Sequence, residues 1–170
     1  MWEKLLLSLI FFSCAFSQQN INVNYNTYID FELPTISTCT IKLSDFVGQK
    51  LVLLNFWVTW CPYCNTEIPY LIKLANKYKD KNLEIIGINI REPENIVKKF
   101  VSNKQINYIV VLDTTAKVAK KYNIKGVPTN FVINTKGEII FVGHTLPNEE
   151  FITKNLPVFE KERKTKKRTK

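Results

Sequence analysis

The sequence has few side chains that could bind a metal ion. It contains one histidine and four cysteines in 170 residues. Two of the cysteines stand in the motif Cys61-Pro62-Tyr63-Cys64, and beyond the N-terminal segment only Cys39 and His144 remain as further sulfur or imidazole ligands. A structural zinc site needs four ligands. The Cys-x-x-Cys pair alone leaves zinc open, but the shortage of partners disfavours it, and we expect no metal site.

The sequence also lacks the run of about 20 apolar residues that a membrane-spanning helix requires. The apolar stretch Leu5–Phe12 is much shorter, and Ala15-Phe16-Ser17 then supplies small residues. This pattern is typical of a signal peptide over residues 1–17 that is removed on export. Cys14 offers a second interpretation, lipid attachment after cleavage, and an uncleaved N-terminal anchor is a third. Each interpretation predicts an extracytoplasmic protein of the periplasm or cell envelope.

The positive charge is concentrated at the C-terminus. Residues 160–170 contain seven cationic and two anionic side chains, a net +5 of the total +9. This distribution indicates a basic, disordered tail over residues 158–170 and argues against a nucleic-acid-binding face. Weak attraction of the tail to anionic lipids is an alternative. The apolar content of 45% suits one folded domain, which we expect over residues 29–157 after an Asn-rich linker at residues 18–28.

Strand-like and helix-like patterns alternate along this domain. Strands are predicted at residues 30–34, 40–43, 51–57, 83–90, 108–112, 130–133 and 138–142. Helical segments are predicted at residues 44–48, 65–79, 93–102, 114–122 and 147–156. The order predicts an α/β fold in which helices flank a central mixed β-sheet, with a hairpin at the N-terminus and another near the end.

The most informative motif joins the apolar strand Leu51–Trp57 to the helix that follows it. If Cys61 begins that helix, Cys64 lies one turn later on the same face, within bonding reach. The helix N-terminus favours a thiolate at Cys61, and the thiolate is the reactive form of cysteine. The two thiols are therefore predicted to cycle between a dithiol and a disulfide.

The residues around this motif resemble a known family. Four segments occur in the same order as in the TlpA/ResA-like extracytoplasmic thiol–disulfide oxidoreductases, which have the thioredoxin fold. These segments are Leu43–Gly48, Asn55–Cys64, Glu67 with Pro69, and Gly126–Thr129. The resemblance spans about residues 30 to 155 and includes a strand and helix between Leu83 and Leu112 that the shortest thioredoxins lack.

The resemblance implies a role for each residue near the dithiol. Cys61 would attack the substrate and Cys64 would resolve the mixed disulfide, so the dithiol itself is the redox group and no cofactor is expected. Glu67, one turn after Cys64, would exchange a proton with the thiols, although a solvated helix residue is the alternative. Thioredoxin places a buried Asp on the preceding strand for that task, where this chain has Asn55.

The substrate is expected to contact residues on both sides of the dithiol. These are Trp60, Pro62, Tyr63, Val127 and Pro128. The resemblance implies a cis bond between Val127 and Pro128, which would leave the preceding backbone free to pair with an extended substrate. A trans proline in an ordinary loop is the alternative. Cys39 is expected to be an incidental free thiol, and His144 a surface residue without a catalytic role.

The leading hypothesis is a monomeric enzyme that reduces protein disulfides. The resemblance implies apocytochrome c as the candidate substrate and a membrane thiol-electron transporter as the source of electrons. Other hypotheses are a disulfide-forming oxidant, and a peroxiredoxin-like peroxidase, although the Thr that such a peroxidase has three residues before its cysteine is replaced by Val58. A metal-carrying or client-binding module represents a different class of function.

Overall fold

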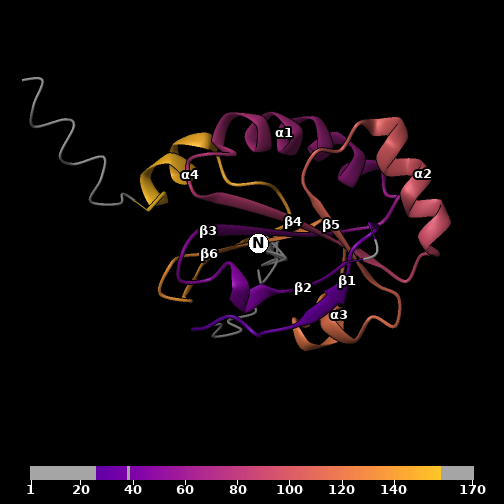
Figure 1. Ribbon diagram of the computed structural model, residues 1–170, viewed down its shortest axis with the longest axis horizontal. Helices are drawn as coiled ribbons and strands as arrows, with labels where there is room; N and C mark the ends of the chain where they lie inside the picture. Colours follow the sequence, from indigo (N-terminus) through magenta and orange to yellow (C-terminus); the bar gives the residue numbers. More distant parts are fainter. Residues whose placement is uncertain (1–25, 38, 158–170) are drawn as a thin grey trace, which may run out of the picture.

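The computed structural model describes residues 26–37 and 39–157. They form a five-stranded sheet with helices on both faces, and a separate two-stranded sheet (Figure 1). The strands are β1 (Glu32–Pro34), β2 (Thr40–Lys42), β3 (Leu51–Trp57), β4 (Leu83–Ile90), β5 (Ile109–Asp113), β6 (Thr129–Ile133) and β7 (Ile139–Gly143). The helices are the 3-10 turn η1 (Leu43–Asp45) and α1 (Pro62–Tyr78), α2 (Glu94–Lys104), α3 (Lys117–Lys121) and α4 (Glu149–Asn155). The predicted α/β class is confirmed.

The large sheet has the strand order β5-β4-β3-β6-β7. Strands β3, β4 and β5 are parallel, whereas β6 runs antiparallel to β3, and β7 antiparallel to β6. Every residue of β3 is buried, as expected for a central strand that is covered on both faces. Asn55 of β3 pairs in register with Asn130 of β6. Two amide side chains therefore meet in the buried centre of the sheet.

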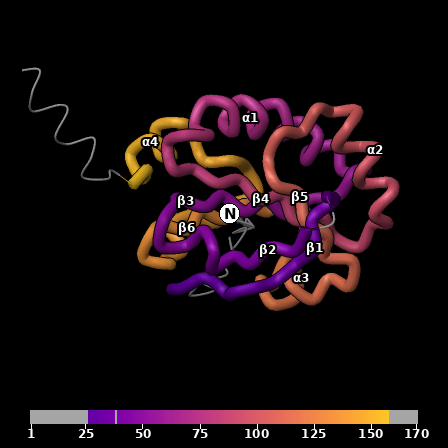
Figure 2. The backbone as a smooth tube through the Cα atoms, viewed as in Figure 1, coloured from indigo at the N-terminus to yellow at the C-terminus, as the bar shows by residue number. Residues whose placement is uncertain are grey.

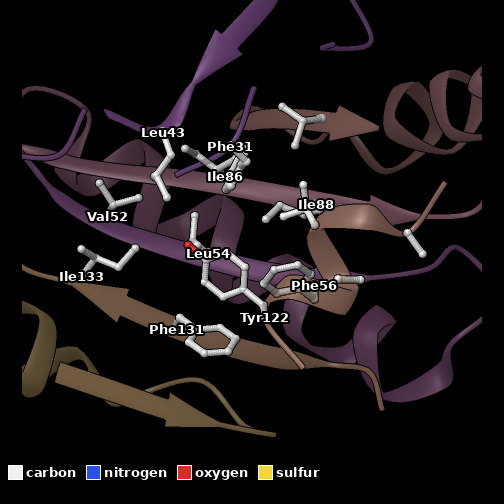
Figure 3. Packing of buried hydrophobic residues seen from close by; sticks show 14 residues of the cluster. Phe31, Leu43, Val52, Leu54, Phe56, Ile86, Ile88, Tyr122, Phe131 and Ile133 are labelled. Atoms are coloured by element: carbon white, nitrogen blue, oxygen red, sulfur yellow. The ribbon is translucent and has the colours of Figure 1, made fainter. Parts of the chain in front are cut away.

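The two faces of the sheet have separate apolar cores. Helices α1, α2 and α4 lie on one face, and α3 and the β1–β2 hairpin lie on the other, as the backbone trace also shows (Figures 1 and 2). On the α3 face the rings of Phe56, Tyr122 and Phe131 pack together, with centroids 5.2 to 5.7 Å apart (Figure 3). The hairpin is joined to the sheet by a hydrogen bond from the Ile36 N–H to the Val110 carbonyl (3.2 Å).

Some predicted helix boundaries are wrong for local reasons. The start of α1 at Pro62, with Cys61 as its cap, agrees with the prediction that Cys61 begins the helix, whereas the apolar periodicity had indicated only residues 65–79. Helix α3 covers only Lys117–Lys121 of the predicted 114–122, because Ala116 has a left-handed conformation (φ 56°) that cannot belong to a helix. Helix α4 begins two residues later than predicted, where the Asn148 side chain accepts from the Phe151 N–H.

The predicted signal segment, most of the linker and the basic tail lie outside the described residues. Within residues 26–37 and 39–157, no helix combines the length and apolar character that crossing a bilayer demands.

Candidate active site

Cys61 and Cys64 form a disulfide at the start of α1, with their Cα atoms 5.2 Å apart. Both residues are buried, with 4% and 2% of their surface exposed. Cys61 caps the helix: its Sγ accepts a hydrogen bond from the Cys64 N–H at 3.1 Å. When the disulfide is reduced, this N–H and the helix N-terminus favour a thiolate on Cys61.

Two side chains hold the turn between β3 and α1. The turn is closed by the Cys61 N–H, which donates to the Val58 carbonyl (3.3 Å). The Asn65 amide donates to the carbonyls of Thr59 (3.1 Å) and Cys61 (2.9 Å). From the other side, the carboxylate of Glu92 accepts hydrogen bonds from Thr59. The backbone that presents Cys61 is therefore fixed from both sides.

Glu67 is bound by the two paired amides of the sheet. Nδ2 of Asn55 donates to one Glu67 oxygen (3.2 Å), and Nδ2 of Asn130 donates to both (3.2 Å each). Asn55 also donates to Oδ1 of Asn130 (2.7 Å), which orients the pair. Burial raises the pKa of Glu67 above its ordinary value, an effect that the amide hydrogen bonds oppose. The alternative of a solvated helix residue is wrong, because Glu67 is half-buried and fully hydrogen-bonded.

The segment before β6 approaches the disulfide. The bond between Val127 and Pro128 is cis, as the resemblance implied. The Val127 carbonyl lies 3.7 Å from the Cys61 Sγ. His144, at the end of β7, is exposed as predicted, but its Nδ1 lies 2.8 Å from the Pro128 carbonyl, to which it donates. The surface position predicted for His144 is confirmed, and its contact with the Pro128 carbonyl is an additional finding.

Large exposed side chains surround the buried sulfurs. Trp60 and Tyr63 are 75% and 77% exposed, and Pro62 between the cysteines is exposed as well. Trp57, in contrast, is 1% exposed and packs on Phe100 of α2. Exposed aromatic rings are uncommon on a soluble domain and often mark contact surfaces.

A groove of about 520 Å³ lies between α1 and the segment that leads from β7 into α4. Its α1 wall contains Tyr63 and Glu67, and Pro128 also lines it. The opposite wall is formed by the segment between β7 and α4, from His144 to Glu149. Three of the predicted site residues, Tyr63, Glu67 and Pro128, therefore line this groove, whereas the two cysteines are not among its lining residues.

Three residues of the site were not predicted from the sequence. Asn130 could have been noticed as a polar residue inside an apolar strand. His144 and Glu92 carry no such signal, because turns of the chain bring them to the site from β7 and from the loop after β4. Cys39 is exposed and unpaired, as expected. In the described part of the chain, no group of three or more His, Cys, Asp or Glu side chains could hold a metal ion.

Comparison with known proteins identifies the family. Residues 26–142 match the model of the AhpC/TSA family. The chain belongs to this family. It is 36% identical over 139 residues to the thiol–disulfide oxidoreductase ResA of Halalkalibacterium halodurans, which covers 82% of this chain and 78% of that protein. It is 37% identical to ResA of Bacillus subtilis, over 66% of this chain and 63% of that protein.

Solved structures agree with this assignment. The thioredoxin domain of a thiol–disulfide oxidoreductase from Bacteroides vulgatus superposes with a TM-score of 0.67 and 26% identity, covering 76% of this chain and 93% of that one. The chain is therefore a thioredoxin-fold thiol–disulfide oxidoreductase with a Cys-x-x-Cys active site, and it acts on disulfide-bearing substrates.

Proposed function

We propose that this oxidoreductase reduces disulfides in proteins outside the cytoplasm. The direction of electron transfer is inferred from the Glu67 carboxylate. Glu67 lies one helical turn after Cys64, and the sheet residues Asn55 and Asn130 donate hydrogen bonds to it. A negative charge near a dithiol destabilises the thiolate of the reduced state. Strong oxidants work the opposite way, by stabilising their reduced form. A site with this carboxylate gives up electrons more readily.

The electrons pass in two exchange steps. The Cys61 thiolate attacks one sulfur of the substrate disulfide, so that a Cys61–substrate bond forms and the substrate bond breaks. The released substrate sulfur takes up a proton. The Cys64 thiolate then attacks Cys61, which forms the Cys61–Cys64 disulfide and releases the second substrate thiol. Glu67 accepts the proton of Cys64 in this step and passes it to the second departing sulfur, while the first departing sulfur is protonated from water. Two electrons and two protons thus end on the substrate, and Glu67 returns to its starting state.

The surface around the disulfide supplies the substrate contacts. Trp60, Pro62 and Tyr63 offer an apolar rim, and the backbone of Val127, before the cis proline, would offer an edge for an extended peptide. Replacing Trp60 by Ala should raise KM for a protein substrate and leave kcat unchanged, because the exposed ring contacts the substrate and not the reacting sulfurs. Replacing Ile96, an exposed apolar residue of α2, by Ala is the matched control.

The segment before the domain supports an extracytoplasmic location, because residues 1–17 read as an export signal. Outside the cytoplasm the surroundings are oxidising, so a membrane thiol-electron transporter would have to reload the dithiol. Oxidised apocytochrome c, the substrate that the resemblance to ResA-like proteins implies, is the candidate client.

The test is a trapping experiment with the full chain. Cys64→Ala should accumulate mixed disulfides through Cys61, which mass spectrometry of the captured partners identifies. Cys39→Ala is combined with it to exclude capture through the exposed thiol. Cys61→Ala should capture none. No mixed disulfide with Cys64→Ala would favour a metal-carrying or client-binding module instead.

The reduction potential of the Cys61–Cys64 pair distinguishes a reductase from a disulfide-forming oxidant. Equilibration with glutathione should give a value near that of thioredoxin, about −270 mV, and far from the roughly −120 mV of a strong oxidant. A value near the second number would replace the reductase hypothesis with that of a disulfide-forming oxidant. Thiol-dependent turnover of peroxide would favour the peroxidase.

A further inference from the structure

A second buried carboxylate lies next to the active-site turn and outside the groove. Glu92 follows β4 and is 8% exposed. Its Oε2 accepts hydrogen bonds from the Thr59 N–H (2.7 Å) and from Nδ2 of Asn89 (2.6 Å). Its Oε1 accepts from the Thr59 hydroxyl (2.5 Å). One carboxylate thus binds both donors of Thr59, a residue 33 positions earlier in the chain.

The carboxylate of Glu92 has no cationic partner within residues 26–37 and 39–157. The four ion pairs there involve other acidic residues, and the three donors of Glu92 are neutral. Burying a carboxylate against neutral donors costs free energy that an apolar side chain would not cost.

The hydrogen bonds between Glu92 and Thr59 affect the position of Cys61 through the backbone. Thr59 is the second residue of the turn that the Cys61 N–H closes onto the Val58 carbonyl. Glu92 holds the N–H of Thr59, and Asn65 holds its carbonyl (3.1 Å). Two residues later, Cys61 has an extended conformation (φ −80°, ψ 115°) and leads into the helix. The place of its sulfur at the helix N-terminus therefore depends on the position of this turn.

We propose that Glu92 is a positioning residue for Cys61. It fixes the turn through Thr59, so that the reduced Cys61 sulfur lies at the N-terminus of α1 and faces the Cys64 N–H. The role differs from that of Glu67, which lies in the groove and is bound by the sheet amides. The inference rests on the thiol chemistry of the Cys-x-x-Cys motif and is independent of the direction of electron transfer.

Two substitutions of Glu92 separate position from charge. Glu92→Gln keeps an oxygen for the Thr59 N–H and for Asn89, and its amide can donate to the Thr59 hydroxyl. Glu92→Ala removes all three contacts. Both variants lose the same negative charge, an effect that alone would move thiolate formation to lower pH. The difference between the two variants therefore reports the position of the turn.

The experiment uses the reduced full chain and a small aromatic disulfide as the probe. Glu92→Ala should react about tenfold more slowly than Glu92→Gln, because misplacing a reacting group by a fraction of an ångström has effects of this order. Its thiolate absorbance should also appear at higher pH than that of Glu92→Gln. Glu94→Ala, which breaks an exposed ion pair with Lys98 nearby, is the control and should match the wild type.

Equal rates and equal pH profiles for Glu92→Ala and Glu92→Gln, with only the unfolding midpoint changed, would overturn the proposal and leave Glu92 a role in stability alone. If Glu92→Ala does not fold, two substitutions of Thr59 provide the test. Thr59→Val loses the hydroxyl bond and should be slower than Thr59→Ser, which keeps it; equal rates for that pair would also overturn the proposal. These comparisons measure thiolate reactivity, so an oxidising potential for the wild type would refute the reductase hypothesis and leave them unaffected.

Discussion

Replacing Glu67 by Gln removes a proton acceptor from the groove while keeping the length of the side chain. The Gln oxygen can still accept from Asn130 or from Asn55, whose amides reach the present carboxylate at 3.2 Å. The variant should therefore fold with the dithiol in place. What it loses is the ability to take the proton from Cys64 in the second exchange step.

The size of the loss follows from the surroundings of Glu67. A well-placed general base contributes roughly 10²- to 10⁴-fold to a rate. Glu67 is half-buried and lines an open groove, so water can replace part of its function. We therefore expect Glu67→Gln to slow the second exchange step by an amount at the lower end of this range, about 100-fold. This factor corresponds to ~2.7 kcal/mol in activation free energy.

The pH dependence has a defined sign. Burial raises the pKa of Glu67, so its carboxylate forms at higher pH than that of an ordinary glutamate. In the wild type the rate at which Cys64 resolves the mixed disulfide should rise as the pH passes this raised pKa. In Glu67→Gln this rise of the rate with pH should be absent. A carboxyl with a raised folded-state pKa also stabilises the protein most at low pH. The unfolding free energy of the wild type relative to Glu67→Gln should therefore fall as the pH increases through that pKa.

A single-turnover assay measures both effects. Reduced protein is mixed with an excess of a model disulfide, the reaction is quenched with acid, and the decay of the Cys61 mixed disulfide is followed by mass spectrometry across the pH range. Glu94→Gln, on the exposed face of α2, is the control. A rate for Glu67→Gln within about threefold of the wild type, with the same pH profile, would refute the proton-transfer role.

Two further predictions concern the packing that supports the site. Tyr122→Phe should lower the free energy of unfolding in urea by about 1–3 kcal/mol without changing the rate of disulfide exchange, because its hydroxyl donates to the carbonyl of Ile29 (2.7 Å) and accepts from the N–H of that residue (3.2 Å), far from the dithiol. Gly87→Ala should cost about 1–3 kcal/mol by the same measurement, because a Cβ there would lie 3.0 Å from Nε1 of the buried Trp57, whereas Gly126→Ala, with nothing within 4 Å, should cost much less.

The sequence predicted the elements whose patterns are local. The apolar run of β3 and the Cys-x-x-Cys spacing are patterns of residues close together in the chain. The central strand and the Cys61–Cys64 disulfide predicted from them are both confirmed. The length of α3 was overestimated because the predicted helix ran across Ala116, whose backbone is left-handed (φ 56°). The buried Asp113, which lies before this residue, accepts a hydrogen bond from the Ala119 N–H (2.7 Å). Tertiary contacts of this kind do not appear in helix propensities.

The hydrogen-bonding environment of the two carboxylates was less predictable. That Asn130 would stand opposite Asn55 depends on the register of β3 and β6, and a shift of one residue would have turned it to the other face. The contact between Glu92 and Thr59 joins two loops that only the sheet order brings together. Polar partners that come from separate strands are fixed by the whole fold, so residue patterns along the chain could not predict them.

The two walls of the groove differ in how firmly the sheet holds them. The α1 wall follows the central strand β3, whose amides should exchange with solvent only on global unfolding. The other wall follows the edge strand β7 and is tied to α1 by contacts of Glu149 with Lys77 and with the Tyr78 hydroxyl (2.8 Å). Local opening at the edge costs less than global unfolding, so hydrogen exchange should be fastest there. Opening at this edge would widen the groove and leave the sulfurs, which follow the central strand, in place.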